Sequence, residues 1–155
     1  MAGGGRDIGM RRAGSGDADA AAVVVRAAFA PYVARIGREP APMAADYGAL
    51  CAEGRVTLAE TSGAGPVGVL VAYPKGGWLH VETVAAATPR LGVGRALMAA
   101  AAAEAARLGL AGLHLYTNAA MTEALAFYDA LGFARIGRRM EAGFDRVYFR
   151  KEVER

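Results

Sequence analysis

The alternation of apolar and polar residues divides the chain into segments of two kinds. Four stretches place apolar residues three or four positions apart, the spacing of a helix with one buried face. They span residues 15–29, 44–52, 94–108 and 119–131. Shorter stretches alternate apolar with polar residues or form brief apolar runs, which indicates strands. They span residues 8–12, 55–61, 67–73, 78–85, 113–117, 133–139 and 144–151.

Proline and glycine support these boundaries. Pro31 ends the first helix, because a proline inside a helix removes a backbone hydrogen bond. Ser15 or Asp17 is expected to cap the start of that helix. A glycine follows each of the other three helices, as is common after a helix end: Gly54, Gly109 and Gly132. Residues 141–143 join the last two strands as a hairpin.

The order of the elements predicts one α/β (α+β) domain. A strand, two helices, three strands, a helix, a strand, a helix and two strands would form one sheet of about six to seven strands flanked by four helices. The helix at 94–108 connects two strands that should therefore run parallel. A chain of 155 residues fits a single domain. We expect a flexible tail at residues 1–7 and the folded domain at residues 8–155.

Composition and charge exclude several classes of function. The net charge is only +3, and basic residues are scattered among acidic ones, so no nucleic-acid surface is indicated. The longest uncharged apolar run, residues 96–103, is too short to cross a membrane. Residues 1–14 lack the apolar core of a secretory signal. The single cysteine, Cys51, cannot form an internal disulfide and is interpreted as a packing residue. We expect a cytoplasmic protein without a metal site.

A glycine-rich turn precedes the long alanine-rich helix. Gly92 and Gly94 can adopt backbone conformations closed to other residues, and they leave peptide groups uncovered. The first amides of the helix have no partner within it, and the helix dipole is positive there, so a phosphate or diphosphate fits this place. No Gly-Lys-Ser/Thr is present, and Leu97 stands where a dinucleotide fingerprint has its third glycine. A tight strand-to-helix turn is the alternative interpretation.

Two motifs together resemble the GNAT N-acetyltransferase superfamily. One is Gly92-x-Gly94 at the start of the third helix, and the other is the segment Ala124-Leu-Ala-Phe-Tyr-Asp-Ala-Leu-Gly-Phe133. With the order of elements, the resemblance covers residues 8–151. It implies a GNAT-type mixed, mostly antiparallel sheet. It also implies an enzyme that transfers acetyl from acetyl-CoA to a primary amine, directly in a ternary complex.

The resemblance implies where the cofactor would lie. The CoA diphosphate would bind the amides of the glycine turn, which here are those of Leu91, Gly92, Val93, Gly94, Arg95 and Ala96. The pantetheine arm would pair with a strand that splays from its neighbour, at Val84, Ala85 and Ala86. Pro89 has no N–H where relatives carry Gln or Arg, which puts one contact in doubt. Met121 stands where relatives often have an asparagine, and Asn118 would either contact CoA or cap the next helix.

Three residues are candidates for the chemistry that the resemblance implies. Tyr128 matches the tyrosine that donates a proton to the departing CoA thiolate, although it could instead be a packing residue. The acceptor ammonium must lose a proton before it attacks, which requires a base acting directly or through water. Glu82 is the first candidate, with a structural ion pair as the alternative. His80, two positions earlier on the same strand face, is the second, with a packing or hydrogen-bonding role as the alternative.

The segment at residues 31–43 contains three prolines, a glycine, two arginines and a glutamate among apolar residues. We interpret it as a rigid, irregular loop that either binds the acceptor or connects two helices in solvent. Its candidate substrate-binding residues are Tyr32, Arg35, Arg38 and Glu39. The two arginines weakly favour an acceptor that carries a carboxylate or phosphate.

Other readings remain open from the sequence alone. A CoA-binding sensor or assembly module without catalysis would keep the glycine turn, as would a protein that binds an unrelated phosphorylated ligand. The partner expected for an enzyme is a small-molecule amine. A homodimer through the last two strands is possible, because an open sheet edge can pair with a second copy.

Overall fold

The computed structural model describes residues 7–63, 65–87 and 92–154. Within these residues one sheet contains seven strands in the order β1-β2-β3-β4-β5-β7-β6. Every neighbouring pair is antiparallel except β4–β5, which is parallel and is connected through a helix. The predicted mixed, mostly antiparallel sheet is therefore confirmed. The strands are β1 (Ile8–Arg12), β2 (Val56–Thr61), β3 (Gly65–Lys75), β4 (Trp78–Ala86), β5 (Gly112–Asn118), β6 (Ala134–Glu141) and β7 (Phe144–Glu152).

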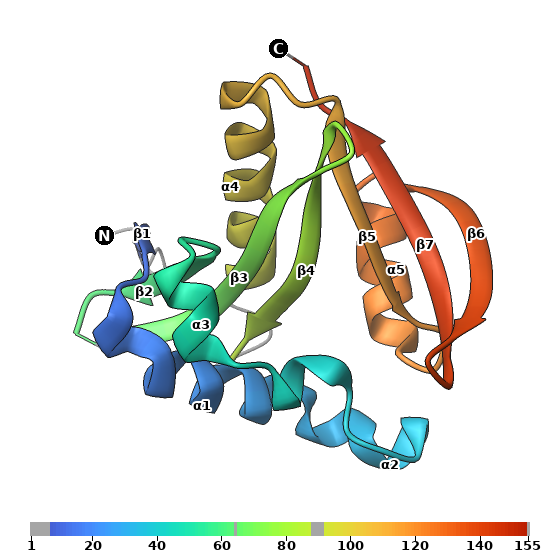
Figure 1. Ribbon diagram of the computed structural model, residues 1–155, viewed down its shortest axis with the longest axis horizontal. Helices are drawn as coiled ribbons and strands as arrows, with labels where there is room; N and C mark the ends of the chain where they lie inside the picture. The colour runs from blue at the N-terminus through green and yellow to red at the C-terminus, as the bar shows by residue number, and fades with distance from the viewer. Residues whose placement is uncertain (1–6, 64, 88–91, 155) are drawn as a thin grey trace.

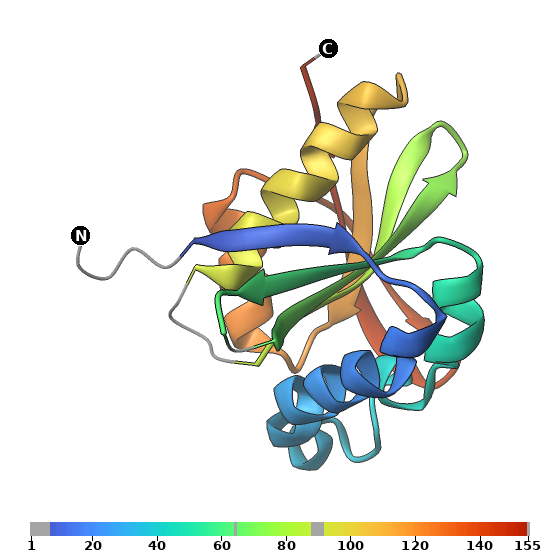
Figure 2. The same cartoon turned by 90° about the vertical axis from the view of Figure 1, so that its left-hand side faces the viewer.

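Helices cover both faces of the sheet (Figures 1 and 2). One hydrophobic core joins the sheet to α4 (Val93–Arg107) and α5 (Thr122–Ala130), and a second core joins it to α1 (Ala18–Phe29) and α3 (Tyr47–Ala52). The four predicted helices are present in the described part of the chain, together with one additional short turn of helix. The helices are α1 (Ala18–Phe29), α2 (Val33–Ile36), α3 (Tyr47–Ala52), α4 (Val93–Arg107) and α5 (Thr122–Ala130).

The long helix α4 is held close to the centre of the sheet. A Cβ added at Gly68 of β3 would lie 2.5 Å from Cγ1 of Val93, so glycine permits the helix to approach the strand backbone. The predicted apolar side of the helix is buried at Leu97, Met98, Ala101 and Ala105. Leu108, the last residue of the predicted span 94–108, follows the last helical residue, Arg107, and is 41% exposed. This packing fixes the position of the glycine turn beside the sheet.

Two local expectations near the N-terminus differ from the structure. The Asp17 side chain accepts hydrogen bonds from the Gly14 amide and from Arg11, and it does not cap the first turn of α1. The segment 31–43 is less irregular than predicted, since it forms α2 between two short 3-10 turns. Those turns are Ala30–Tyr32 and Ala41–Ala44. Proline fits the first positions of such turns, where its missing N–H has no helical partner.

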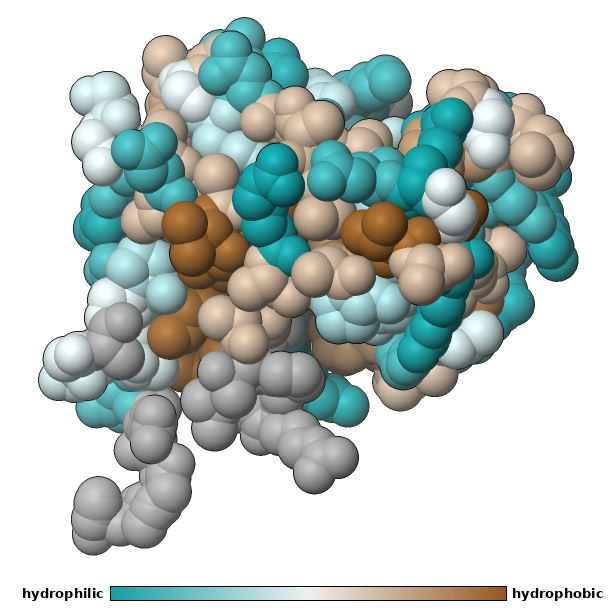
Figure 3. All heavy atoms as spheres, turned by 90° about the horizontal axis from the view of Figure 1, so that it is seen from below, coloured by the Kyte–Doolittle hydropathy of each residue, from teal (hydrophilic) through white to brown (hydrophobic). Residues whose placement is uncertain are grey.

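Cys51 is buried among apolar side chains, as the packing interpretation predicts. The surface seen from below, over α1 and α2, mixes hydrophobic with polar side chains and shows no single continuous apolar patch (Figure 3). None of the helices in the described ranges has the length and hydrophobicity needed to cross a bilayer.

Strands β4 and β5 diverge after a short contact, as Figure 1 shows. They pair only at Leu79 with Leu113 and at His80 with His114. The register between β3 and β4 also shifts there, since Val71 pairs with Thr83 but Ala72 pairs with Val81. Glu82 is therefore left without a direct partner on β3, in a β-bulge. The divergence predicted for this strand pair is confirmed, and it leaves an opening in the middle of the sheet.

Candidate active site

Two cavities meet at the opening between β4 and β5. The first, of about 400 Å³, lies beside the start of α4, and we call it the α4 cavity. The second, of about 330 Å³, lies toward the β6–β7 hairpin, and we call it the β7 cavity. The residues that line both cavities come from α1, β4 and the region of α5: Phe29, Val84, Met121, Ala124 and Tyr128. A ligand in one cavity would therefore lie next to a ligand in the other.

The glycine turn and the first turn of α4 form one wall of the α4 cavity. Gly92 has φ of 75°, a left-handed conformation that favours glycine, and it immediately precedes the helix. The amides of Val93, Gly94 and Arg95 belong to the first helical turn and have no partner within the helix. The amide of Ala96 instead donates to the Gly92 carbonyl at 3.0 Å. Ala96 is therefore a poor candidate for the predicted anion contact.

Part of the predicted cofactor site falls outside the described residues. Leu91, which was expected to contribute an amide, lies there, as do Pro89 and Arg90. Arg95 is described and lines the α4 cavity. Gly94 also lines it, and a Cβ at this position would lie 3.3 Å from Cζ of Phe127. The cavity therefore combines exposed backbone with one nearby positive side chain.

The end of β4 forms the opposite wall of the α4 cavity. Val84, Ala85 and Ala86 pair with β3 on one side, and their strand has no β5 partner at these positions. All three line the cavity. Backbone groups on the β5 side of this strand can therefore pair with an extended ligand, in the manner of an added strand.

Tyr128 lies between the two cavities and is only 8% exposed. Its ring packs against Phe127, Phe133 and Phe149, with centroid separations of 5.2, 5.5 and 5.5 Å. Burial raises the pKa of the phenol above its ordinary value. The hydroxyl therefore keeps its proton at neutral pH and can donate a hydrogen bond. The packing role and the predicted chemical role are compatible in this position.

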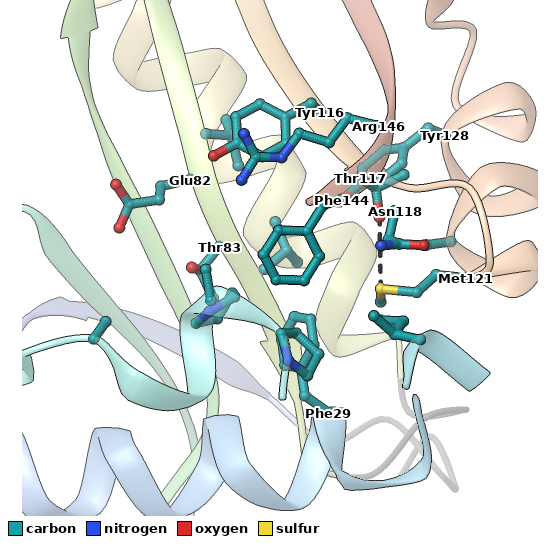
Figure 4. A pocket seen from close by; sticks show the side chains of 18 residues that line it. Phe29, Glu82, Thr83, Tyr116, Thr117, Asn118, Met121, Tyr128, Phe144 and Arg146 are labelled. Atoms are coloured by element: carbon teal, nitrogen blue, oxygen red, sulfur yellow. Dashed lines mark hydrogen bonds between the residues drawn. The ribbon is translucent and has the colours of Figure 1, made fainter. Parts of the chain in front are cut away.

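The β7 cavity is lined mainly by side chains from separate strands (Figure 4). Glu82 and Thr83 come from β4, Tyr116 comes from β5, and Phe144 and Arg146 come from β7. The segment at residues 40–42 adds further apolar lining. This cavity therefore has a carboxylate and a guanidinium on walls that are otherwise largely aromatic and apolar.

Glu82 lines the β7 cavity and has one side-chain hydrogen bond. The Tyr73 hydroxyl donates to its Oε1 at 3.2 Å. Among the described residues no lysine or arginine pairs with this carboxylate, so the ion-pair alternative is not observed there. Glu82 is placed where it can meet a ligand, directly or through water.

His80 lies on the same face of β4 but does not line either cavity. It is 5% exposed, and its Nδ1 lies 3.1 Å from Nδ1 of His114. Burial, with smaller contributions from the charges of His114 and Lys75, lowers the pKa of His80 to about 4. A neutral, enclosed imidazole fits the packing alternative better than the predicted role as a second base. Its ring supports Tyr73, which contacts Glu82.

Asn118 is the last residue of β5 and does not cap α5, whose N-cap residue is Met121, so the capping alternative is wrong. Its Oδ1 accepts a hydrogen bond from the Ala120 amide at 2.8 Å, and its carbonyl accepts from Met121 at 2.9 Å. It lines the β7 cavity and not the α4 cavity, so the predicted cofactor contact has no support from its position. Met121 is buried, lines both cavities and accepts a weak hydrogen bond from Thr117 at 3.8 Å.

The four predicted substrate-binding residues are mostly used to connect parts of the fold. Arg35 forms a two-pronged ion pair with Glu123 of α5, at 2.5 and 2.8 Å. Arg38 lies 3.7 Å from the ring centroid of Phe144 and donates to the carbonyl of Ala142. Glu39 is exposed and lies 3.8 Å from Arg26. Tyr32 is the one of the four that lines a cavity, and it lines the α4 cavity.

Sequence reasoning missed Arg146, Tyr116 and Phe144, which line the β7 cavity. The alternation along the last strand places Arg146, Tyr148 and Arg150 on one face, a signal that the sequence does contain. That alternation is equally typical of a solvated face. Only the divergence of β4 from β5 makes part of this face a cavity wall.

A mixed sheet that opens between two parallel strands, with a glycine turn and a buried tyrosine at the opening, defines a protein of the acetyltransferase class. The family model of the acetyltransferase (GNAT) family matches residues 24–133. The chain belongs to this family. No curated protein matches the sequence significantly.

Solved structures support the same fold. Ard1 from Thermoplasma volcanium is 16% identical, with a TM-score of 0.76, over 96% of this chain and 99% of that chain. PaiA N-acetyltransferase from Thermoplasma acidophilum, solved in complex with coenzyme A, is 14% identical, with a TM-score of 0.77, over 94% and 99%. Ribosomal-protein-S18-alanine N-acetyltransferase from Escherichia coli is 17% identical, with a TM-score of 0.72, over 96% of each chain.

Proposed function

We propose that this protein is an acetyl-CoA-dependent N-acetyltransferase that moves acetyl directly to a primary amine in a ternary complex. The observation that carries the proposal is the position of Tyr128 where the two cavities meet, at the opening between β4 and β5. A cofactor in the α4 cavity and an acceptor in the β7 cavity would meet beside its hydroxyl. The complex of the PaiA relative with coenzyme A supports this choice of cofactor.

The α4 cavity suits the two polar parts of the CoA molecule. The amides of Val93, Gly94 and Arg95 would bind the diphosphate, and charge-assisted hydrogen bonds are worth about 1.5–3 kcal/mol each. The backbone of Val84–Ala86 would pair with the pantetheine amides. Two anchor points would fix the direction of the arm, so that its thioester reaches Tyr128.

Transfer then requires one bond to form and one to break. The free amine attacks the thioester carbonyl carbon, the new C–N bond forms, and the C–S bond breaks with its electron pair left on sulfur. Tyr128 donates a hydrogen bond to the sulfur as negative charge develops there. Its raised phenol pKa makes complete proton transfer to the thiolate uphill, since a thiol titrates near 8.5. The proton released by the nitrogen completes the CoA thiol.

The amine must first be deprotonated, because an alkylammonium titrates near 10 and has no lone pair. Glu82 is the proposed base, acting through water or directly, because this residue lines the β7 cavity, where the acceptor would bind. The Tyr73 hydroxyl orients that carboxylate. No described cysteine lines either cavity, which agrees with direct transfer to the amine.

Two measurements test the proposed function. Thermal shift with CoA, ATP and NAD should show stabilisation by CoA, and free thiol should appear when acetyl-CoA is mixed with a panel of amines. Stabilisation by CoA without turnover of any amine would favour a CoA sensor instead. Stabilisation by ATP alone would contradict a CoA site and favour a different phosphorylated ligand.

Self-association remains a separate prediction. Strand β6 lies at one end of the sheet order, next to β7 alone among the described strands. Its side chains are mostly exposed, including Ile136 and Met140. Sedimentation at several concentrations would test the predicted homodimer through this edge.

A further inference from the structure

Arg146 is an arginine with unused hydrogen-bond donors in the wall of the β7 cavity. Its side chain is only 16% exposed. Its Cζ lies 4.3 Å from the ring centroid of Tyr116 and 5.5 Å from that of Phe144. Its guanidinium donates no hydrogen bond to any residue that the structure describes. Its Nη1 forms a long ion pair with Oε1 of Glu141 at 3.8 Å, a distance too long for a hydrogen bond.

The donors of this guanidinium are available to a ligand. A guanidinium carries five N–H donors, and no nitrogen of Arg146 is both fully buried and unbonded, so these donors reach the solvent of the cavity. Oε1 of Glu141 is itself buried and has no hydrogen-bond partner among the described residues. The two aromatic rings hold the guanidinium in place by cation–π contact but satisfy none of its donors. An anionic group that entered the cavity would supply the missing acceptors.

The position of Arg146 relative to Glu82 indicates what kind of molecule would fit. In Figure 4 its side chain extends from β7 across Tyr116 toward β4, the strand that carries Glu82. The cavity therefore presents a carboxylate from one strand and a guanidinium from another. A molecule with an amino group and an anionic group on the same skeleton matches both charges.

The other arginines near this face do not offer the same contact. Arg139 lies over Tyr148 at 4.1 Å and Arg150 lies over Trp78 at 4.5 Å, and neither lines the β7 cavity. Arg35 and Arg38 are held by Glu123 and by the Ala142 carbonyl. Arg139 and Arg150 make the surrounding field more positive, which favours the approach of an anionic acceptor.

We propose that the acceptor is an amine that also carries a carboxylate or phosphate group, and that Arg146 binds this anionic group. The proposal rests on the function proposed above. Binding at Arg146 would leave the amino group directed toward Glu82 and the thioester. Arg146 would then be a specificity residue, which selects the acceptor without contacting the reacting atoms.

Kinetics with matched acceptors test this directly. The acceptors are the common amino acids, their carboxamides, the corresponding decarboxylated amines, and aminoethylphosphonate as the phosphate-like probe. Within the set of compounds that the wild-type protein uses best, the amino acid should have a higher kcat/KM than its carboxamide and its decarboxylated amine. Arg146→Gln should lower kcat/KM for that acid by about 10–100-fold and leave the neutral forms nearly unchanged. Whether the carboxylate or the phosphonate is preferred identifies the anionic group.

Two further variants distinguish a direct contact between Arg146 and the acceptor from a general effect of positive charge near the cavity. Arg150→Gln removes one positive charge from the same strand outside the cavity, and it should preserve the preference for acids. Glu141→Gln removes the carboxylate nearest to Arg146, so it should maintain or strengthen that preference. Equal losses in Arg146→Gln and Arg150→Gln, or no preference for acids in the wild-type protein, would overturn the proposal.

A binding measurement keeps the two proposals distinguishable. Calorimetry in the presence of CoA should show that the N-acetylated acids bind the wild-type protein and bind Arg146→Gln much more weakly. If no amine is turned over but this difference is found, the transferase proposal fails and the anion site stands. If neutral amines are turned over equally by both proteins, the transferase proposal stands and the anion site is refuted. Absence of acid binding to the wild-type protein also refutes it.

Discussion

The α4 cavity and the β7 cavity share one wall, but the remaining walls are lined by different kinds of chemical group. The α4 cavity is lined by backbone of the glycine turn and of the end of β4, by apolar and aromatic side chains, and by Arg95 and Glu123. The β7 cavity has a carboxylate, a guanidinium and aromatic rings brought together from three strands. The comparison teaches that backbone groups suit a ligand that is common to a family. Side chains, which can be exchanged without changing the fold, suit a ligand that differs between its members.

The two cavities are also held in place by different kinds of contact. The α4 cavity depends on close packing, since Gly68 lets α4 approach β3 and Gly94 faces Phe127. The β7 cavity depends on contacts across the chain, in which Arg38 of the 31–43 segment contacts the β6–β7 hairpin. Changes in the first cavity should therefore alter cofactor affinity, and changes in the second should alter acceptor kinetics.

The largest effect is expected for Gly94→Asp in the α4 cavity. The added carboxylate would compete with the diphosphate for the same amides, which should weaken CoA binding by about 100-fold or more. An acidic residue in the first helical turn is favourable for the helix itself, so the variant should fold. Calorimetry with CoA measures the effect. Gly16→Asp, at a position with open space around it, is the matched control and should bind CoA normally. Equal affinities would contradict the cofactor assignment.

Tyr128→Phe tests the residue that the two cavities share. The ring and its packing against Phe133 and Phe149 remain, but the hydroxyl is lost. The value of kcat should fall by about 10–100-fold, with little change in CoA affinity. Thiol release at saturating substrate measures kcat. Tyr148→Phe, another buried tyrosine that lines neither cavity, should leave kcat nearly unchanged. An unaltered kcat in Tyr128→Phe would remove this hydroxyl from the mechanism.

Glu82→Gln should affect the β7 cavity alone. We expect kcat/KM to fall by about 10-fold near neutral pH, with CoA affinity unchanged. The deficit should shrink as the pH rises toward the pKa of the amine, near 10, because the acceptor then deprotonates without help. A pH–rate profile measures both effects. Tyr73→Phe, which keeps the carboxylate but removes its hydrogen bond, should show a smaller loss. A deficit independent of pH would indicate a positioning role for Glu82.

The smallest effect on the two cavities is expected for His80, which lines neither of them and instead affects the stability of the fold behind Glu82. The pKa of His80 is lowered from about 6.5 to about 4 in the folded protein, so the unfolded chain binds a proton that the folded protein excludes. The free energy of unfolding should not depend on His80 above about pH 6.5, and it should decrease by about 3 kcal/mol at most as the pH falls to about 4. Urea denaturation across this range measures it. His80→Gln should reduce the slope, and an unchanged slope would contradict the shifted pKa.

Much of the fold follows from local patterns in the sequence. The seven strands and four main helices are close to their predicted positions, because each buries one face with its own period. The parallel pair follows from the strand–helix–strand order around α4. The segment 31–43 was predicted less well. Its three prolines were interpreted as an irregular loop, whereas Pro31 and Pro42 lie in short 3-10 turns.

Some features of the candidate site could be predicted from local motifs, and others depend on contacts between distant parts of the chain. Gly92 and Gly94 belong to a local motif, so their place beside a helix start could be predicted. The partners of Arg35 and Arg38 could not, because Glu123 and Ala142 are 88 and 104 residues away along the chain. His80 was identified as a candidate base from its residue type, its place on the same strand face as Glu82 and the family resemblance. Its burial against His114 depends on a neighbouring strand.

The sequence by itself determined the periodic elements, the glycine turn before α4 and the family motif that contains Tyr128, because these depend on residues near one another in the chain. The tertiary structure alone decided which charged side chains face the opening. Strands β4, β5 and β7 bring Glu82, Tyr116 and Arg146 to one cavity. The physical reason is that strand pairing sets which distant residues meet, and the divergence of β4 from β5 leaves the space between them unfilled.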